Sequence, residues 1–504
     1  MVENGKACMS YKGAELMFLN VDRHNQNKVA IKDDSGYTLT YADITRTIEE
    51  FNELNLSRSI IFCLCENCAG ALVGYLAFEN NKQVPLLLSA GMDEELRCNL
   101  DAVYTPTYYW LPDRMVAELG GEKVYAAYGY TLMKTTNEPY PINEKLSLLL
   151  TTSGSTGSPK LVRHKYGNLE SNAKNVAKVF SWTVDEVGIC DLPMNYTMGL
   201  NVINSHLVVG ASVLMVKSNL MDPDFWEFIA ANGGTSFCGV PFSYEVMRRV
   251  GFDKMNLPKL YTLAEGGGKL TDKMFKWMAM FAKNSGKRFC ATFGTSETSA
   301  RMAFLDPEMA LEKTGSIGKA IPDGELFLLD EVVNEDSTVT GELGYRGPNV
   351  TMGYALCKED LMKDDVFCGE YHTGDIAMRD EDGYYFIIGR KGRFLKLFGL
   401  RVSLDEMERI LKTQYPNVDF VCTGDDKRMN IFMTDKNFEN QIIPFISKKT
   451  KLHNSAFRVY VIDEIPRNDY GKVRFTELKK IEEKGFNERD RDAQKGNGLS
   501  EDEI

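Results

Sequence analysis

The chain has 504 residues, of which 43% are hydrophobic and 26% are charged, as is usual for a globular protein with a large buried core. Its 71 acidic residues exceed its 59 basic residues and give a formal net charge of −12. This charge argues against a general surface for nucleic acid or for an anionic membrane, because both bind basic faces. It does not exclude one small anionic ligand, which a few local donors can bind.

The first residues lack the charged-then-apolar layout of a signal peptide, and the longest largely apolar stretch, 206–216, is too short to cross a bilayer. Together with eleven irregularly spaced cysteines, this indicates a cytoplasmic protein with reduced thiols. Cys63, Cys65 and Cys68 lie close enough to suggest zinc, but no fourth ligand is placed to complete a site. We interpret them as small apolar residues of a buried strand.

Strands and helices alternate in the first half of the sequence, which predicts a parallel sheet covered on both faces. The pattern is first seen between 37 and 90 and returns at 141–250. The predicted elements are strands at 37–41, 58–65, 83–88 and 146–152 and helices at 42–54, 68–81 and 166–180.

Between 314 and 390 the sequence pattern changes to short β segments separated by turn residues, which predicts a β-rich subdomain. A smaller unit begins after Arg390. It opens with a predicted helix at 404–414, whose start, Ser403 followed by Glu406, fits a capping box.

A loop of small residues, TTSGSTGSPK at 151–160, follows the predicted strand 146–152. Small residues let backbone N–H groups approach a phosphate closely, hydroxyls add donors, and Lys160 adds a positive charge. The loop is not a Walker A loop, because Pro159 stands where the second glycine of that pattern belongs. From these residues alone, a flexible linker and a phosphate-binding loop both remain open.

Residues 152–160 match throughout the Thr-Ser-Gly-[Ser/Thr]-Thr-Gly-x-Pro-Lys signature of the ANL superfamily of adenylating enzymes. This superfamily contains acyl-CoA synthetases, adenylation domains of peptide synthetases, and luciferases. Further segments resemble its motifs in the same order, so that the resemblance covers about residues 37 to 480. These segments are DLPMNYTMGL (191–200), EGGGKL (265–270), ATFGTSET (291–298), GELGYRGPNVTMGY (341–354), YHTGDIA (371–377), GRKGRFLKLFGLRVSLDEME (389–408) and IPRNDYGKVRF (465–475).

The resemblance implies an α/β protein with a large N-terminal AMP-binding domain, 1–389, made of αβ-layered subdomains plus the β-rich subdomain. A hinge at 390–392 would join it to a small, mobile α+β C-terminal domain at 393–480. The charged tail, 481–504, is expected to be disordered past about residue 490. Gly392 departs from the family, which usually has Asp at that hinge position; glycine permits a backbone rotation there.

The reaction that the resemblance implies is attack of a carboxylate on the α-phosphate of ATP, which forms an acyl-AMP and expels pyrophosphate. Lys472, Glu297 and Lys160 are the implied catalytic residues. Lys472 would bridge the substrate carboxylate and the α-phosphate, Glu297 would bind Mg²⁺, and the loop with Lys160 would hold the β,γ-phosphates. The implied nucleotide-binding residues are Thr152, Ser153, Gly154, Ser155, Thr156, Gly157, Lys160, Gly266, Gly267, Gly268, Thr292, Phe293, Gly294, Thr295, Ser296, Asp375, Arg390 and Lys472.

Four of these residues have ordinary interpretations when each is taken alone. Lys472, which follows a glycine, fits a solvated surface lysine. Glu297 fits a helix-start carboxylate, Asp375 a turn aspartate, and Arg390 a surface arginine. The resemblance instead assigns Asp375 to both ribose hydroxyls and Arg390 to ribose or phosphate.

The substrate pocket is assigned to Tyr196, where acyl-CoA synthetases often have His, and to Thr197. Adenylation domains for amino acids carry an Asp that binds the substrate ammonium, and Thr197 stands there in this chain. We therefore expect a small carboxylic acid, whose acyl group then passes to the thiol of coenzyme A or of a carrier-protein phosphopantetheine. An amino acid ligase of the D-alanine type, loading a carrier protein, is the alternative. A nucleotide-binding sensor without turnover is a third hypothesis, which Gly392 alone favours.

Overall fold

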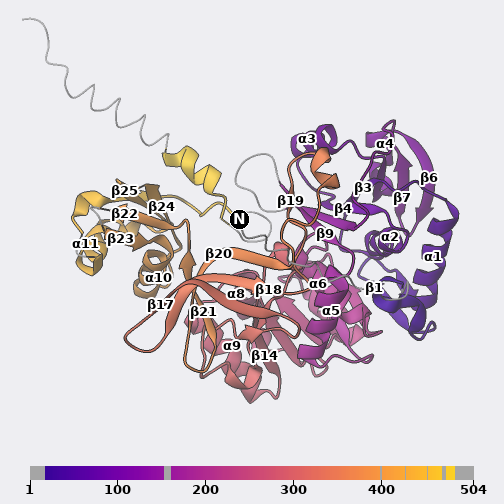
Figure 1. Ribbon diagram of the computed structural model, residues 1–504. Coiled ribbons are helices and arrows are strands. Elements are labelled where there is room, and N and C mark those ends of the chain that lie inside the picture. Colours follow the sequence, from indigo (N-terminus) through magenta and orange to yellow (C-terminus); the bar gives the residue numbers. More distant parts are fainter. Residues whose placement is uncertain are drawn as a thin grey trace, which may run out of the picture. The chain divides into compact units, whose positions relative to one another are not determined.

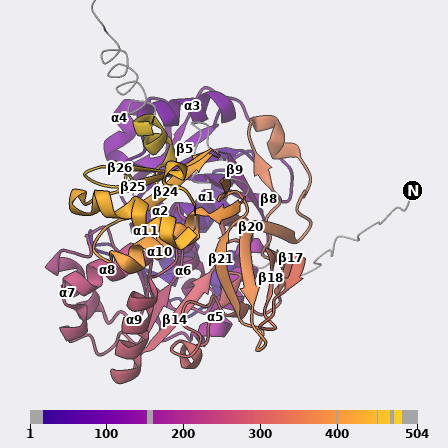
Figure 2. The ribbon, with the colours of Figure 1, turned by 90° about the vertical axis from the view of Figure 1, so that its left-hand side faces the viewer.

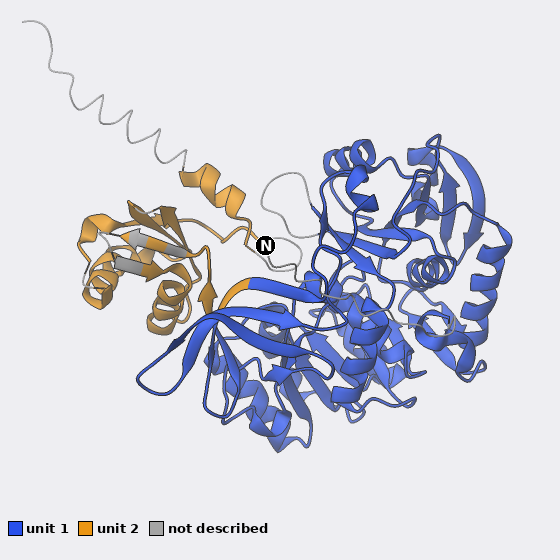
Figure 3. Cartoon of the chain, viewed as in Figure 1, with its two compact units in different colours: residues 1–153, 158–373, 377–387 blue, residues 154–157, 374–376, 388–504 orange. Residues whose placement is uncertain are grey.

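The computed structural model of the chain divides into two compact units (Figure 3). Unit 1 contains the described residues up to 373 together with 377–387, and unit 2 contains 374–376 and the described residues from 388 onward. The structure describes residues 17–151, 160–397, 400–425, 427–450, 452–467 and 473–482. The predicted disorder past residue 490 lies outside these residues.

A nine-stranded sheet in unit 1 has the strand order β16-β15-β14-β13-β12-β10-β11-β1-β2. Its central strands, from β14 to β1, pair in parallel, whereas β2, β15 and β16 pair antiparallel at the edges. The strands are β1 (Val29–Asp33), β2 (Thr38–Thr40), β10 (Val187–Cys190), β11 (Ser212–Met215), β12 (Ser236–Gly239), β13 (Thr262–Glu265), β14 (Arg288–Phe293), β15 (Ala303–Phe304) and β16 (Lys319–Ala320).

Helices cover both faces of this sheet, as the alternating sequence pattern predicted. On one face, α5 (Asn168–Phe180) and α6 (Thr197–Leu207) belong to the same core cluster as Cys190, Cys238 and Cys290. On the other face, the core contains residues of α7 (Pro223–Asn232), α8 (Pro241–Arg249) and α9 (Asp272–Asn284). Figures 1 and 2 both show α9 beside β14. All eleven residues of α6 are buried, so this helix lies inside unit 1.

A second sheet of eight strands, also in unit 1, has the order β19-β9-β8-β4-β3-β5-β7-β6, with a parallel centre from β8 to β5. Cys63 and Cys65 lie in its central strand β3, and Cys68 directly precedes α2; all three thiols are buried, which confirms their apolar interpretation. The elements are β3 (Ile60–Cys65), β4 (Val84–Ser89), β5 (Tyr108–Pro112), β6 (Glu122–Ala127), β7 (Tyr130–Lys134), β8 (Leu146–Thr151), β9 (Leu161–Lys165), β19 (Tyr354–Ala355), α1 (Tyr41–Glu53), α2 (Ala69–Asn80), α3 (Glu94–Tyr104) and α4 (Val116–Leu119).

The β-rich region predicted at 314–390 is confirmed. It forms a four-stranded sheet in the order β17-β18-β20-β21. These strands are β17 (Glu325–Val333), β18 (Val339–Arg346), β20 (Glu370–Arg379) and β21 (Tyr385–Arg390).

Unit 2 has its own core, in which two helices pack on a three-stranded sheet with β24 antiparallel and β26 parallel to β25. The predicted helix at 404–414 is present as α10, and Ser403 Oγ accepts a hydrogen bond from the Glu406 N–H at 3.3 Å, which is one half of the predicted capping box. The elements are β22 (Phe394–Leu397), β23 (Leu400–Ser403), α10 (Leu404–Gln414), β24 (Phe420–Asp425), β25 (Arg428–Met433), α11 (Glu439–Thr450) and β26 (Phe457–Val461).

Short 3-10 helices of the chain are η1 (Phe18–Arg23), η2 (Asp113–Met115), η3 (Phe252–Lys254), η4 (Ser296–Thr298), η5 (Pro307–Met309), η6 (Lys358–Met362), η7 (Lys436–Phe438) and η8 (Asn454–Ala456).

Candidate active site

Two of the predicted motif segments follow neighbouring parallel strands. Strand β13 ends at Glu265 and leads into Gly266–Gly268, and β14 ends at Phe293 and leads into Gly294. Because the carboxyl ends of parallel strands lie at the same edge of a sheet, these turns are brought together there. This edge is where open α/β sheets bind their ligands.

The glycine turn after β13 lies against residues of the other motifs. A Cβ added to Gly267, whose φ is +77°, would lie 3.2 Å from Tyr196 Oη. A Cβ on Gly266 would lie 2.8 Å from Thr292 Oγ1 and 2.7 Å from the methyl carbon of Met198. The turn therefore has no room for larger residues, and the structure brings together Tyr196, the glycines and Thr292.

Gly268 departs from the alanine that is usual in this motif, and the structure gives a physical reason. A Cβ on Gly268 would lie 2.9 Å from Cγ of Pro241, the first residue of α8. The proline ring is held at the start of that helix and has little freedom to move away. Glycine at 268 therefore avoids a close contact with Pro241 in this chain.

The predicted pocket residue Thr197 lies beside the turn after β14. Thr197 is the first residue of α6, and its Oγ1 lies 3.2 Å from Ser296 Oγ. The turn is tight at Gly294, where a Cβ would come within 1.4 Å of the Ala300 carbonyl oxygen. The contact thus joins the 191–200 and 291–298 motifs.

Glu297 and Lys160 both contact the side chain of Tyr354. Glu297 lies in the first turn of η4, as its helix-start interpretation predicted, and its Oε1 accepts a hydrogen bond from Tyr354 Oη at 2.7 Å. Lys160 Nζ lies 3.7 Å from the centre of the Tyr354 ring. Burial, and next the negative charge of Glu297, raise the pKa of Tyr354, so its hydroxyl stays a hydrogen-bond donor. A carboxylate, a phenol and an ammonium group are therefore assembled from three separate motifs.

In unit 2, Asp375 and Arg390 form an ion pair, with Arg390 Nε 2.9 Å from Asp375 Oδ1. Asp375 lies within strand β20, so the turn interpretation of this residue is wrong. Its side chain is 12% exposed, whereas that of Arg390 is 62% exposed, as expected for a surface arginine. The Lys391 N–H donates to the Gly374 carbonyl oxygen at 2.6 Å, which connects the middle residue of the predicted hinge to the Thr-Gly-Asp segment.

Several predicted site residues lie outside the described residues. They are Thr152, Ser153, Gly154, Ser155, Thr156 and Gly157 of the loop, and Lys472. The strands that flank the loop are described: Thr151 of β8 pairs with Leu161 of β9 in an antiparallel ladder. The chain thus leaves and re-enters the eight-stranded sheet at neighbouring positions, with Lys160 directly before β9.

Two buried carboxyl groups stand at the carboxyl ends of the nine-stranded sheet. Burial raises the pKa of Glu265 to about 8 and that of Asp191 to about 7. One carboxyl oxygen of each has no hydrogen-bond partner. Glu265 is therefore largely protonated and Asp191 partly protonated at neutral pH, so neither group acts as a fixed anion there.

Sequence reasoning gave no role to Tyr354 or Arg301, which the structure places at the site. Tyr354 belongs to the quoted 341–354 motif, but its contact with Glu297 spans 57 residues of sequence. Arg301 is 1% exposed, and its Nε lies 3.4 Å from Thr292 Oγ1. A signal existed for Arg301: it is a lone charge in the run SARMAF, directly after the 291–298 motif.

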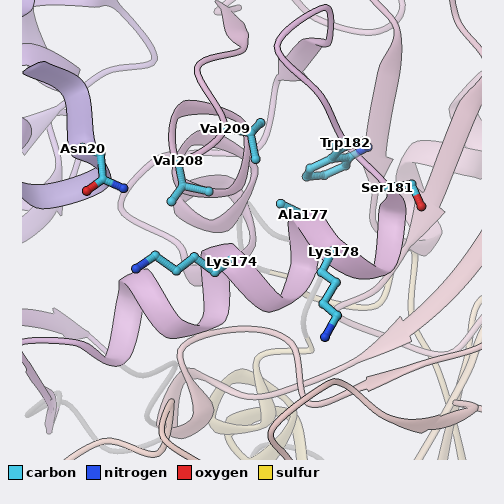
Figure 4. A pocket seen from close by; sticks show the side chains of 8 residues that line it. All are labelled: Asn20, Lys174, Ala177, Lys178, Ser181, Trp182, Val208 and Val209. Atoms are coloured by element: carbon cyan, nitrogen blue, oxygen red, sulfur yellow. The ribbon is translucent and has the colours of Figure 1, made fainter. Parts of the chain in front are cut away.

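A pocket of about 390 Å³ lies elsewhere on unit 1, between α5 and the end of α6 (Figure 4). Ala177, Val208 and Trp182 line its wall, and the Lys174 and Lys178 side chains extend at its rim. None of the predicted site residues that the structure describes lines this pocket.

The described residues contain no group of three or more His, Cys, Asp or Glu side chains that could hold a metal ion by themselves. A single carboxylate such as Glu297 nevertheless suits Mg²⁺, which usually takes one or two protein carboxylates together with substrate phosphates and water. Among the helices of the described part of the chain, none is both long and apolar enough to cross a bilayer.

Glycine- and hydroxyl-rich turns at the carboxyl ends of parallel strands, with a lysine and a carboxylate nearby, are typical of α/β proteins that bind an anionic ligand at this edge of the sheet. Residues 83–355, more than half of the chain, match the family described as AMP-binding enzyme. The chain belongs to this family.

Several enzymes of known activity resemble this chain in sequence or in fold. A 2-succinylbenzoate–CoA ligase of Bacillus cytotoxicus is 25% identical over 369 residues, which are 70% of this chain and 75% of the relative. The o-succinylbenzoate CoA synthetase (MenE) of Bacillus subtilis, solved with the acyl-adenylate OSB-AMP, superposes with a TM-score of 0.74 at 18% identity, covering 92% of this chain and 98% of that one. ATP-bound MatB from Rhodopseudomonas palustris superposes with a TM-score of 0.70 at 20% identity, covering 92% and 98%.

These findings confirm three predictions: the adenylate-forming superfamily, the α/β fold with a large N-terminal and a small C-terminal part, and the enzyme class. The protein is an AMP-forming ligase of the acyl-CoA synthetase type. The Bacillus subtilis enzyme has also been solved with ATP and a magnesium ion, and a double mutant of it with the product analogue OSB-NCoA.

Proposed function

We propose that this protein activates a small carboxylic acid with ATP and Mg²⁺, releases pyrophosphate, and passes the acyl group from acyl-AMP to the thiol of coenzyme A. The observation that carries the proposal is the meeting of Lys160 and Glu297 at Tyr354. Lys160 supplies a cation and Glu297 a carboxylate suited to a metal ion, and both contact Tyr354. Glu297 follows strand β14, close to the edge where the glycine turns lie.

The residues present fit ATP and Mg²⁺. Gly266 and Gly267 carry no side chain, so a nucleotide base or sugar could approach the backbone of this turn closely, and Tyr196 and Thr292 pack against the same turn. Glu297 offers a hard oxygen ligand for Mg²⁺, and Lys160 a positive charge for phosphate oxygens. Mg²⁺ bound at Glu297 would neutralise part of the charge that builds up on the phosphates. Tyr354 holds the Glu297 carboxylate in one orientation by its 2.7 Å hydrogen bond.

In this proposal, the loop 152–157 and Lys160 bind the pyrophosphate side of ATP, and Asp375 binds the ribose hydroxyls. Arg390, paired with Asp375, adds a charge close to the ribose. Lys472 bridges the attacking carboxylate and the α-phosphate. These roles come from the resemblance of the motifs, and each is a hypothesis for mutation. The hinge at 390–392 and the boundaries of the two domains, 1–389 and 393–480, are likewise part of the proposal.

Coenzyme A is the proposed acceptor because the relatives are described as CoA ligases. The carrier-protein alternative with an amino acid substrate finds less support, since Thr197 stands where adenylation domains for amino acids carry the Asp that binds the substrate ammonium. The third hypothesis, a sensor without turnover, differs in predicting nucleotide binding without acid-dependent chemistry.

The test is a product assay. The purified full-length chain is incubated with ATP, Mg²⁺, coenzyme A and a panel of carboxylic and amino acids, and acyl thioesters are detected by mass spectrometry. An acyl-CoA formed together with AMP is expected. Product that appears only on an added phosphopantetheinylated carrier, with an amino acid, would favour the alternative. ATP binding without AMP formation for any acid would support the sensor and contradict the proposal.

A further inference from the structure

Arg301 is a buried cation whose contacts are all neutral. Its side chain is 1% exposed; Nη1 donates to Asn201 Oδ1 and Nη2 to Cys238 Sγ at 2.8 Å. Its Nε contacts Thr292 Oγ1 at 3.4 Å. Within the described residues, no carboxylate forms an ion pair with this guanidinium. Arginine is almost never fully buried without an anionic partner, because an unpaired charge in the interior is costly.

The position of Arg301 follows from α6. Thr197, in the predicted acid pocket, and Asn201 are four residues apart, so they lie on one face of the helix, about 6 Å apart along its axis. Thr197 contacts Ser296 at the carboxyl edge of the sheet, whereas Asn201 contacts Arg301. Arg301 therefore lies about one helical turn deeper than the mouth of the predicted pocket, between α6 and the sheet.

Beyond Arg301 the interior is closed. An adjoining cavity measures about 10 Å³, enough for about one water molecule and no more. The residues that line this cavity along with Arg301 include Trp182, Val202, His206, Ser236 and Ala264. Burial lowers the pKa of His206 to about 4, so the imidazole is neutral and supplies no second cation. A long acyl chain thus finds no room past the guanidinium.

We propose that Arg301 forms the far end of the acid pocket and selects a short acid that carries a second carboxylate at its other end. The proposal rests on the proposed function. The second carboxylate would give Arg301 the anionic partner that the chain itself does not provide, and the planar guanidinium suits two-point binding of a carboxylate. A monocarboxylate of the same length would place a methyl group against a buried charge. An amino acid would bring an ammonium group near a cation. Met198, whose methyl carbon lies against Gly266, can change rotamer to admit a substrate.

The experiment compares acids of equal carbon number: succinate with butyrate, and glutarate with valerate. Acid-dependent exchange of labelled pyrophosphate into ATP is measured with the full-length wild-type chain. We expect each dicarboxylate to exceed its monocarboxylate by about 10²-fold or more in kcat/KM, because a site built to bind a polar group rejects the analogue that lacks it. Equal rates for the two members of each pair would overturn the proposal while leaving the proposed function intact. Absence of exchange with every acid would instead contradict the proposed function, and this proposal with it.

Arg301→Met removes the charge at similar volume and should abolish the preference for dicarboxylates. Arg288→Met is the matched control, because Arg288 also contacts the core, donating to the Phe180 carbonyl oxygen at 3.0 Å, but from the first residue of β14. It should keep the wild-type preference. A folded Arg301→Met protein that still prefers dicarboxylates would contradict the proposal. If that variant does not fold, the acid pairs measured on the wild-type chain decide the question.

Discussion

The Tyr354 hydroxyl donates a hydrogen bond of 2.7 Å to the carboxylate of Glu297. The same segment contributes a second contact, because the Thr351 N–H donates to the Glu297 carbonyl oxygen at 3.0 Å. Glu297 is thus held at both its side chain and its backbone by the 341–354 motif. This gives that motif a physical role: it orients the carboxylate that we propose as the Mg²⁺ ligand.

Tyr354→Phe should therefore weaken catalysis through the metal. Loss of a hydrogen bond that orients a metal ligand costs typically 10–100-fold in metal affinity or activity. We expect the Mg²⁺ concentration for half-maximal pyrophosphate exchange to rise by about 10-fold. The control is Tyr41→Phe, which removes a buried 2.7 Å hydrogen bond to the Ala211 carbonyl oxygen far along the chain. An unchanged Mg²⁺ requirement in Tyr354→Phe would show that the phenol does not orient the ligand.

Lys160→Met should raise the KM for ATP, because it removes the proposed charge for the pyrophosphate side. A loss of about 10–10²-fold in kcat/KM for ATP is expected, with little change in thermal stability, since a cation–π contact contributes about 1 kcal/mol. Lys165, in the same hairpin, is the matched control: it pairs with Asp365 at 2.5 Å. Lys165→Met should lower the melting temperature and leave the KM for ATP unchanged. The reverse pattern would refute the assignment of Lys160.

Glu265 should make the protein less stable as the pH rises. Its pKa is about 8 in the folded chain against an ordinary value near 4.5, so between these values the folded state binds more protons than the unfolded state. Asp191, with a pKa of about 7, acts in the same direction. The buried His164 and His206 act oppositely, but only below about pH 6.5, the ordinary pKa of histidine.

Glu265→Gln removes this titration while keeping the shape of the side chain. The variant should exceed the wild type in stability at pH 8 by on the order of 2–4 kcal/mol and should approach it below pH 4.5. The measurement is the urea midpoint as a function of pH from 6.5 to 8.5, and Glu312→Gln, at an exposed position, is the control. Parallel curves for the wild type and Glu265→Gln would contradict the assigned protonation.

Arg390→Met should affect nucleotide binding more than stability. The side chain is 62% exposed, so its ion pair with Asp375 contributes no more than about 1 kcal/mol. We expect a KM for ATP raised about 10-fold and a melting temperature close to that of the wild type. Arg393→Met is the comparison in the same unit, since Arg393 bonds Glu408 and Asp405 and is 23% exposed. It should lose stability but keep the KM; no change in KM for Arg390→Met would remove Arg390 from the site.

Much of the fold could be predicted from the sequence, because local patterns determine it. The buried run 60–65, the amphipathic helix α10 and the change to turn-rich β segments after 314 each carry their own periodicity. The motif turns could also be placed, since a glycine-rich segment after an apolar strand lies at a sheet edge. The AMP-binding assignment depended on the combined motifs, not on any single loop.

The contacts within the site could not be predicted, because they join residues far apart in sequence. Tyr354 reaches Glu297, and Arg301 reaches Asn201 across 100 residues, only after the sheets have packed. Asp375 was open to interpretation as a turn residue, because the sequence alone does not show that strand β20 continues through Gly374. Tertiary packing determines these contacts and the extent of this strand, and the local pattern of a single sequence does not reveal it.

The central claim is that this chain forms an acyl-adenylate with Glu297 as the metal ligand, and exchange of labelled pyrophosphate into ATP tests it most directly. The account predicts exchange that requires a carboxylic acid in the wild type. It also predicts a fall of about 10²–10³-fold in Glu297→Gln, which keeps an acceptor for Tyr354 but loses the charge, and in Lys472→Ala. Acid-independent exchange, or full exchange in folded Glu297→Gln, would contradict it.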